Sequence, residues 1–144
     1  MKLLLLRQVG WLCLFSAIAA LLTAAFHPRR PAWHQEEALA KGEVLLETAE
    51  GWGPSALWVD ARPRPDYETA HAPGAIHLDL VNWAADFPQF LDRWQPGQRV
   101  VVYCSAASCH LAEEVAERLR KNRIEPVTVL KGGWEAWVAR HPGS

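Results

Sequence analysis

The chain has 144 residues, half of them apolar, and a formal net charge of -1 at pH 7. This length leaves room for one soluble domain of ordinary size, which can build a core without disulfide bonds. A nearly neutral chain offers no long-range attraction to nucleic acid or to an acidic lipid surface, so no nucleic-acid partner is expected. Partners must therefore be inferred from local features of the sequence.

The N-terminus carries an apolar segment of the kind that directs proteins to a membrane. Residues 9–26 contain no charge and follow a charged flank, residues 1–8. The segment is about long enough to span a bilayer, at roughly 1.5 Å per residue. We expect an uncleaved transmembrane anchor, with a cleavable signal peptide as the alternative. Both place the domain outside the cytoplasm: anchored in the membrane and periplasmic if the source is bacterial, or secreted or periplasmic after cleavage.

The first half of the domain predicts one helix and two short strands. Residues 33–49 show the leucine spacing of a helix, although Gly42 disfavours one continuous helix there. An apolar run at 56–59 predicts a buried strand that stops at Asp60. A polar loop with three prolines follows, and a second short strand is expected at 76–78.

The second half alternates between helices and strands. Residues 81–94 predict one or two short helices, and the β-branched run 100–103 predicts the clearest strand. Apolar residues at three- and four-residue spacing predict a helix over 109–121, with acidic residues early and basic residues late, as the helix dipole favours. A last strand, 126–130, precedes a final helix that carries Trp134.

This alternation predicts an α/β domain with a mostly parallel sheet. The domain is expected to span residues 33–140, between a linker at 27–32 and a tail at 141–144. In such sheets, ligands bind beyond the carboxyl ends of the strands. Cys104 and Asp60 both stand at such an end.

Cys104 is the leading candidate for a functional residue. Between its strand and the helix that follows stand small, uncharged residues, whose backbone can wrap closely around the sulfur. The N–H groups of such a loop and the positive end of the helix dipole favour thiolate over thiol. A cysteine is more often an inert core residue, but a position of this kind is what activates a thiol. We therefore predict a reactive sulfur.

Three segments carry motifs in a characteristic order. Residues 59–77 contain Asp-Ala-Arg and end in His-Ala-Pro-Gly-Ala-Ile-His, residues 100–104 read Val-Val-Val-Tyr-Cys, and residues 130–137 contain Gly-Gly-Trp-Glu-Ala-Trp. Together they resemble the rhodanese-like (thiosulfate sulfurtransferase) family. The resemblance implies a mostly parallel five-stranded sheet flanked by helices, here preceded by an N-terminal membrane helix. It also implies a sulfurtransferase in which Cys104 accepts a sulfane sulfur as a persulfide.

The same resemblance implies small-molecule partners and no cofactor. The donor would be thiosulfate, a polysulfide or a persulfide, and the acceptor a thiol or another nucleophile. A persulfide is an anion, so it needs N–H donors around it and no neighbouring carboxylate. The residues that would form this loop are Ser105, Ala106, Ala107, Ser108 and Cys109.

That loop departs from the common family pattern C-R-x-G-x-R. It lacks both basic residues and the glycine, which removes a clamp for anionic thiosulfate. Some family members carry instead a C-x4-C loop like the one from Cys104 to Cys109. A related phosphatase chemistry is disfavoured, because it needs an arginine six residues after the cysteine, where His110 stands.

Two alternatives to sulfur transfer stay open. Cys109 could act as a resolving thiol for a persulfide, sulfenate or disulfide on Cys104, as in a redox sensor; a disulfide would need Cα atoms within about 7 Å. The domain could also be a non-catalytic module that binds a protein partner at the membrane through its tryptophans. For Trp58, Trp134 and Trp137 we expect core packing.

Asp60 and Arg62 are expected to support the site without reacting. A carboxylate at a strand end and a guanidinium two residues later most simply tie loops together by hydrogen bonds and an ion pair. His71 and His77 are expected to serve turn and strand packing, because no Cys and His spacing in the chain predicts a metal site.

Overall fold

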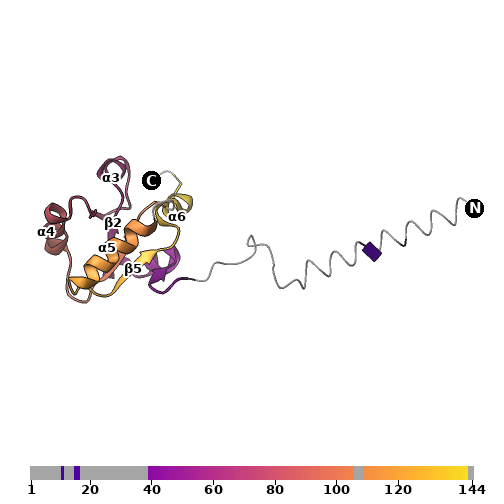
Figure 1. Ribbon diagram of the computed structural model, residues 1–144, viewed down its shortest axis with the longest axis horizontal. Helices are drawn as coiled ribbons and strands as arrows, with labels where there is room; N and C mark the ends of the chain where they lie inside the picture. Colours follow the sequence, from indigo (N-terminus) through magenta and orange to yellow (C-terminus); the bar gives the residue numbers. More distant parts are fainter. Residues whose placement is uncertain (1–10, 12–14, 17–38, 106–108, 143–144) are drawn as a thin grey trace, which may run out of the picture. The chain divides into compact units, whose positions relative to one another are not determined.

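The computed structural model describes Trp11, Phe15, Ser16 and residues 39–105 and 109–142. The chain divides into two compact units, residues 1–38 and 39–144, and the sheet with its flanking helices belongs to the second (Figure 1). Within the described part of the chain, no helix is both long enough and apolar enough to cross a membrane. The predicted anchor at 9–26 lies almost wholly outside that part and stays a prediction.

A parallel sheet forms the centre of the domain. Its strands are β1 (Glu43–Val44), β2 (Ala56–Asp60), β3 (Ile76–His77), β4 (Arg99–Tyr103) and β5 (Val127–Leu130). They lie in the order β1-β5-β4-β2-β3, and every ladder between neighbours is parallel. The predicted α/β class with a mostly parallel, five-stranded sheet is therefore confirmed.

The central strand β4 is apolar on both of its faces. Val100, Val101 and Val102 are fully buried, although successive side chains of a strand point to opposite faces. A parallel sheet that is covered on both sides requires such a continuous apolar run. The β-branched run therefore specifies both the strand and its central place.

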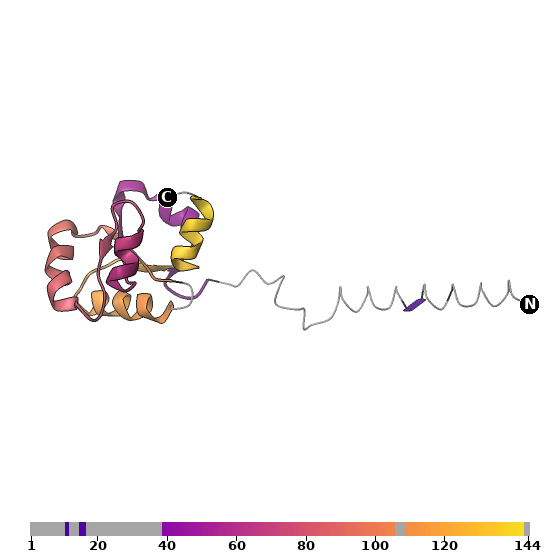
Figure 2. The ribbon, with the colours of Figure 1, turned by 90° about the horizontal axis from the view of Figure 1, so that it is seen from above.

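Helices cover the two faces of the sheet. They are α2 (Leu46–Gly51), α3 (Arg64–Thr69), α4 (Trp83–Arg93), α5 (Cys109–Lys121) and α6 (Gly133–Arg140). Figure 2 shows α5 on one side of the sheet, and α2 with α6 on the other. The inner face of α5, with Ala112, Val115 and Leu119 fully buried, packs on the side chains of β4 that point its way. The predicted amphipathic helix at 109–121 is confirmed.

The predicted helix at 33–49 is wrong over residues 39–45, whereas its last residues, from Leu46 on, form the start of α2. Gly42 has a φ of +96°, which turns the chain out of any helix, and the next two residues form β1. The Gly42 carbonyl accepts from the N–H of Val129, and β1 pairs with β5. Because only two residues form this strand, no alternating pattern marks it. Burial of Val44 decides its conformation: it lies in a second core, an apolar cluster that includes Ala49, Val101 and Leu130.

The predicted polar loop after Asp60 contains a helix, α3. Prolines disfavour helix interiors, but the first turn of a helix accepts them because its N–H groups lack partners within the helix. Pro63 stands at the N-cap of α3, and Pro65 stands in its first turn. The prolines therefore mark the start of this helix.

Candidate active site

Cys104 lies at the carboxyl end of the central strand, directly after β4. Its side chain is 1 % exposed, and its thiol donates a hydrogen bond to the carbonyl oxygen of Ser105 (Sγ–O 3.2 Å). The helix α5 begins at Cys109. Ala106, Ala107, Ser108 and the side chain of Cys109 lie outside the described residues, so the predicted loop around the sulfur and the resolving role of Cys109 stay predictions.

The first two residues of α6 hold the backbone of Cys104. The N–H of Trp134 donates to the Cys104 carbonyl oxygen over 2.8 Å. Gly133, with a φ of +55°, comes so close that an added Cβ would meet this same oxygen at 2.1 Å. Only glycine fits there, because a side chain would clash with the backbone and L residues rarely adopt this φ. The third sequence motif therefore fixes the peptide of the candidate nucleophile.

A buried ion pair at the end of β2 supports the start of α6. The Arg62 side chain donates to both carboxylate oxygens of Asp60, with Nη2–Oδ2 at 2.6 Å and Nε–Oδ1 at 3.0 Å. The guanidinium also lies 4.4 Å from the ring centre of Trp134. Burial alone would lower the pKa of Arg62, but the hydrogen bonds and charge of Asp60 outweigh it and raise that pKa, so the guanidinium stays charged. The structure thus joins the first motif to the third.

Tyr103 links the same region to the chain before β3. Its hydroxyl oxygen accepts a hydrogen bond from the N–H of Ala72 over 3.1 Å. Burial and the nearby charge of Asp60 raise the pKa of Tyr103, so the hydroxyl stays neutral. No local sequence pattern predicts this contact, because its partners are 31 residues apart.

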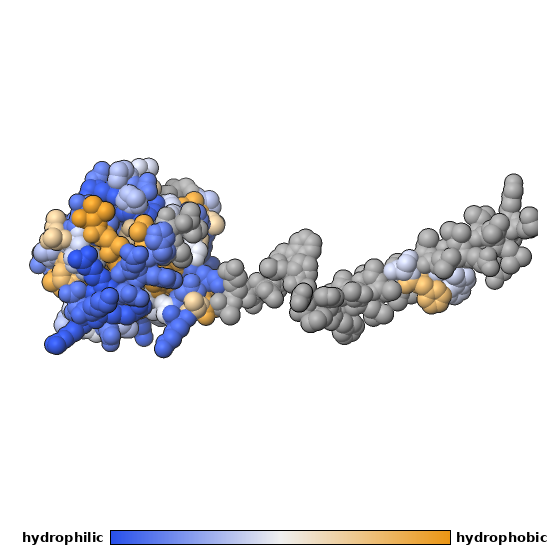
Figure 3. Space-filling model, in the orientation of Figure 1, coloured by the Kyte–Doolittle hydropathy of each residue, from blue (hydrophilic) through white to orange (hydrophobic). Residues whose placement is uncertain are grey.

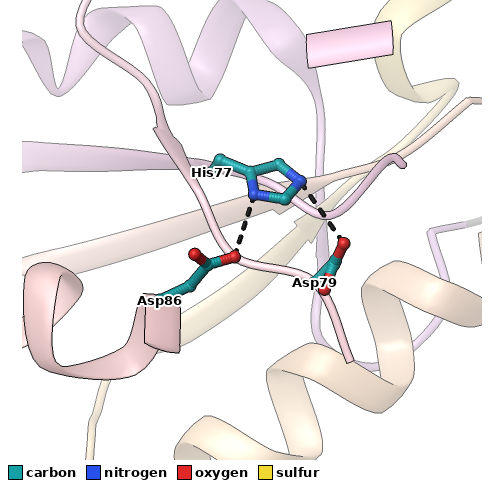
Figure 4. A group of neighbouring side chains, drawn as sticks. All are labelled: His77, Asp79 and Asp86. Atoms are coloured by element: carbon teal, nitrogen blue, oxygen red, sulfur yellow. Dashed lines mark hydrogen bonds and ion pairs between the residues drawn. The ribbon is translucent and has the colours of Figure 1, made fainter. Parts of the chain in front are cut away.

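A second buried polar cluster lies beneath the end of β3 (Figure 4). In it, the imidazole of His77 lies between the carboxylates of Asp79 and Asp86. Nδ1 lies 3.0 Å from Asp86, and Nε2 lies 2.9 Å from the carbonyl oxygen of Arg62 and 3.6 Å from Asp79. Arg64 pairs with the other oxygen of Asp86 over 2.6 Å. The sequence analysis predicted packing for His77 and missed these partners.

These three side chains offer atoms that could ligate a metal, since they lie within 4.8 Å of one another. The hydrogen bonds argue for another role. Both ring nitrogens of His77 already lie within hydrogen-bond distance of protein oxygens, Nδ1 at the Asp86 carboxylate and Nε2 at the Arg62 carbonyl. Arg64 of α3 pairs with Asp86 of α4, so the cluster also ties these two helices together. We assign it a structural role that joins β3 to α3 and α4.

The tryptophans of the described domain are not displayed on its surface. Trp83 is buried, and Trp52, Trp58, Trp94, Trp134 and Trp137 are half-buried. Trp58, Trp134 and Trp137 pack against the second core, as expected. Trp58 and Trp137 meet edge to face, with ring centres 5.3 Å apart. These rings therefore give little support to a binding surface made of tryptophans.

Comparison with known proteins agrees with the fold and the motif order. Residues 43–140 match the rhodanese-like domain. The thiosulfate sulfurtransferase GlpE of Coxiella burnetii is 32% identical over 85 residues, which are 59% of this chain and 74% of that protein. A helix-turn-helix-type transcriptional regulator from Mycobacterium tuberculosis is 29% identical over 103 residues, which are 71% of this chain. The chain spans only 42% of the length of that regulator.

Solved structures give the same result. The Alr3790 protein of Anabaena superposes with a TM-score of 0.54 at 26% identity, over 67% of this chain and 73% of the other. A thiosulfate sulfurtransferase from Pseudomonas aeruginosa gives a TM-score of 0.54 at 26% identity, over 68% of this chain and 18% of the other. Because the family match covers more than half of the chain, the protein belongs to the rhodanese-like domain family.

Proposed function

We propose that the protein transfers sulfane sulfur through a persulfide on Cys104. The observation that carries this proposal is the place of Cys104: it directly follows the central strand, and the first residues of α6 hold its carbonyl. Similarity to thiosulfate sulfurtransferases supports the same chemistry. An enzyme of this kind needs a fixed sulfur, because small displacements of a reacting atom slow a reaction strongly.

The chemistry requires two displacements at sulfur. The Cys104 thiolate attacks the outer sulfur of the donor, an S–S bond forms to Cys104, and the donor's own S–S bond breaks with its electron pair on the leaving group. With thiosulfate, the leaving group is sulfite. An acceptor thiolate then attacks the outer sulfur of the persulfide, and the Cys104 thiolate is restored.

We propose a polysulfide or an organic persulfide as the preferred donor. Thiosulfate carries two negative charges and gains most from basic residues in the loop, whereas this loop has none. A helix start supplies only partial positive charge. Thiosulfate should therefore load Cys104 more slowly than a polysulfide at equal concentration.

Cys109 gives this proposal a redox branch. If its thiol attacks the inner sulfur of a Cys104 persulfide, a Cys104–Cys109 disulfide forms and hydrosulfide leaves. The first position of α5 supports this reading, because a thiol at a helix N-terminus is stabilised as thiolate. Such a disulfide would switch sulfur transfer off until a reductant restores both thiols.

We also propose that residues 9–26 anchor the domain in a membrane, with the domain outside the cytoplasm. The uncharged segment and the preceding basic residues support this placement. An oxidising compartment would favour the disulfide branch. Localisation of a tagged chain, with protease added to intact cells, tests the placement.

The function is tested by loading the full chain with polysulfide and locating added sulfur by peptide mass. We expect one sulfur atom on the peptide that contains Cys104, and none there in Cys104→Ser. Cys109→Ser is the matched control, and it should load normally but form no disulfide. If Cys104→Ser keeps full transfer activity, or if the wild-type chain takes up no sulfur, the domain is a binding module and the proposal is wrong.

A further inference from the structure

A pocket opens at the carboxyl ends of the strands, where Cys104 also lies. Its volume is about 290 Å³, and the loops after β2 and β3 line it together with Leu111 of α5. Figure 3 shows hydrophobic residues exposed on this face, between the positions that α3 and α4 occupy in Figure 1. Val81, which lines the pocket, is 90 % exposed although it is apolar.

The pocket adjoins the candidate nucleophile. Strands β2 and β4 pair with Asp60 opposite Tyr103, so Ala61, which lines the pocket, lies opposite Cys104 at about 5 Å between Cα atoms. The N–H of Ala61 donates to the Tyr103 carbonyl over 2.8 Å, which continues the ladder by one step. Ala61 and Cys104 belong to one apolar cluster, and the pocket residues Leu80 and Leu111 pack against it.

No described residue that lines the pocket offers an unpaired positive charge to an anion. Among the described residues that line it, Arg64 is the only basic one, and its guanidinium is paired with Asp86 over 2.6 Å. Asp79 accepts hydrogen bonds from the backbone and side-chain nitrogens of Asn82. The surface that remains is mostly aliphatic. It suits an uncharged, apolar group and gives no hold on a sulfonate or carboxylate.

We propose that this pocket binds the apolar group of an alkyl or aryl thiol that takes sulfur from Cys104. The inference rests on the proposed function and specifies its acceptor. A cavity of ~150 Å³ accepts benzene, so about 290 Å³ holds a phenyl group or a short alkyl chain. The bound thiolate attacks the outer persulfide sulfur and forms a new S–S bond. The bond between the two Cys104 sulfurs breaks, and its electron pair returns to Cys104.

A homologous series of thiols tests the pocket. Full-length protein is loaded with sulfur, and the rate of sulfur loss is measured with n-alkyl thiols from ethanethiol to hexanethiol, which have similar thiol pKa values. Each methylene group that enters the pocket should raise the rate about two- to fourfold. Val81→Asp should flatten this dependence, because it sets a charge at the rim. The same change at Leu45, which is 50 % exposed and follows β1, the outermost strand on the side away from β3, should leave this dependence intact.

A binding measurement separates this inference from the proposed function. Butyl methyl sulfide cannot react, so it should shift the methyl NMR signals of Val81 and Leu111 whether or not Cys104 carries sulfur. If sulfur never loads but these signals shift, the proposed function fails and the pocket assignment stands. If loading succeeds but rates stay equal along the series, or Val81→Asp keeps the dependence, the inference is overturned.

Discussion

Gly133→Ala should both destabilise the domain and slow sulfur loading onto Cys104. An added Cβ would lie 2.1 Å from the Cys104 carbonyl oxygen and 3.1 Å from its carbonyl carbon, so backbone must move. Overpacking of this kind costs about 1–3 kcal/mol. The φ of +55° adds ~1–2 kcal/mol for any residue with a Cβ. We therefore expect a loss of about 2–5 kcal/mol in unfolding free energy.

The loading rate should fall by ~10- to 100-fold, since the shift acts on the reacting residue. Gly97→Ala is the matched control, because Gly97 has a φ of +83° with open space around its Cβ position. It should lose only the ~1–2 kcal/mol of backbone strain and load at the wild-type rate. Urea unfolding and single-turnover loading measure the two effects. The reasoning fails if both variants unfold and load alike.

Three further substitutions test the polar contacts around the site by urea unfolding. Asp60→Asn leaves the Arg62 guanidinium buried without a counter-charge, so we expect a loss of about 3–5 kcal/mol; a loss below ~1 kcal/mol would contradict a buried ion pair. His77→Leu should lose about 2–3 kcal/mol, because it removes the buried hydrogen bonds of the ring to Asp86 and to the Arg62 carbonyl, whereas the exposed His71→Leu should lose less than about 1 kcal/mol; equal losses would remove the structural role of the cluster. Tyr103→Phe removes the acceptor of the Ala72 N–H, so about 1–2 kcal/mol should be lost, and no change would mean that this N–H finds another partner.

Local patterns were enough to predict much of this domain. The apolar run of β4 and the helical spacing of α5 each specify an element through the residues that it contains. These two elements also flank Cys104, so its place at a strand end followed by a helix could be predicted from the sequence.

Other features depend on residues that are distant in the sequence. β1 has two residues and forms because it pairs with β5, about 85 residues later, which no local pattern encodes. The close approach of Gly133 to Cys104 and the partners of His77 likewise come from separate elements. The pocket next to Cys104 is formed by tertiary packing, because its walls come from the segments that follow β2 and β3 and from α5.

The most direct test of sulfur transfer is the peptide mass of the full chain after one exposure to a sulfane-sulfur donor and removal of excess donor. The account predicts the added mass of one sulfur atom on the peptide that contains Cys104, and its loss when an acceptor thiol is added. No added sulfur, or sulfur that is found on Cys109 while Cys104 stays unmodified, would contradict it.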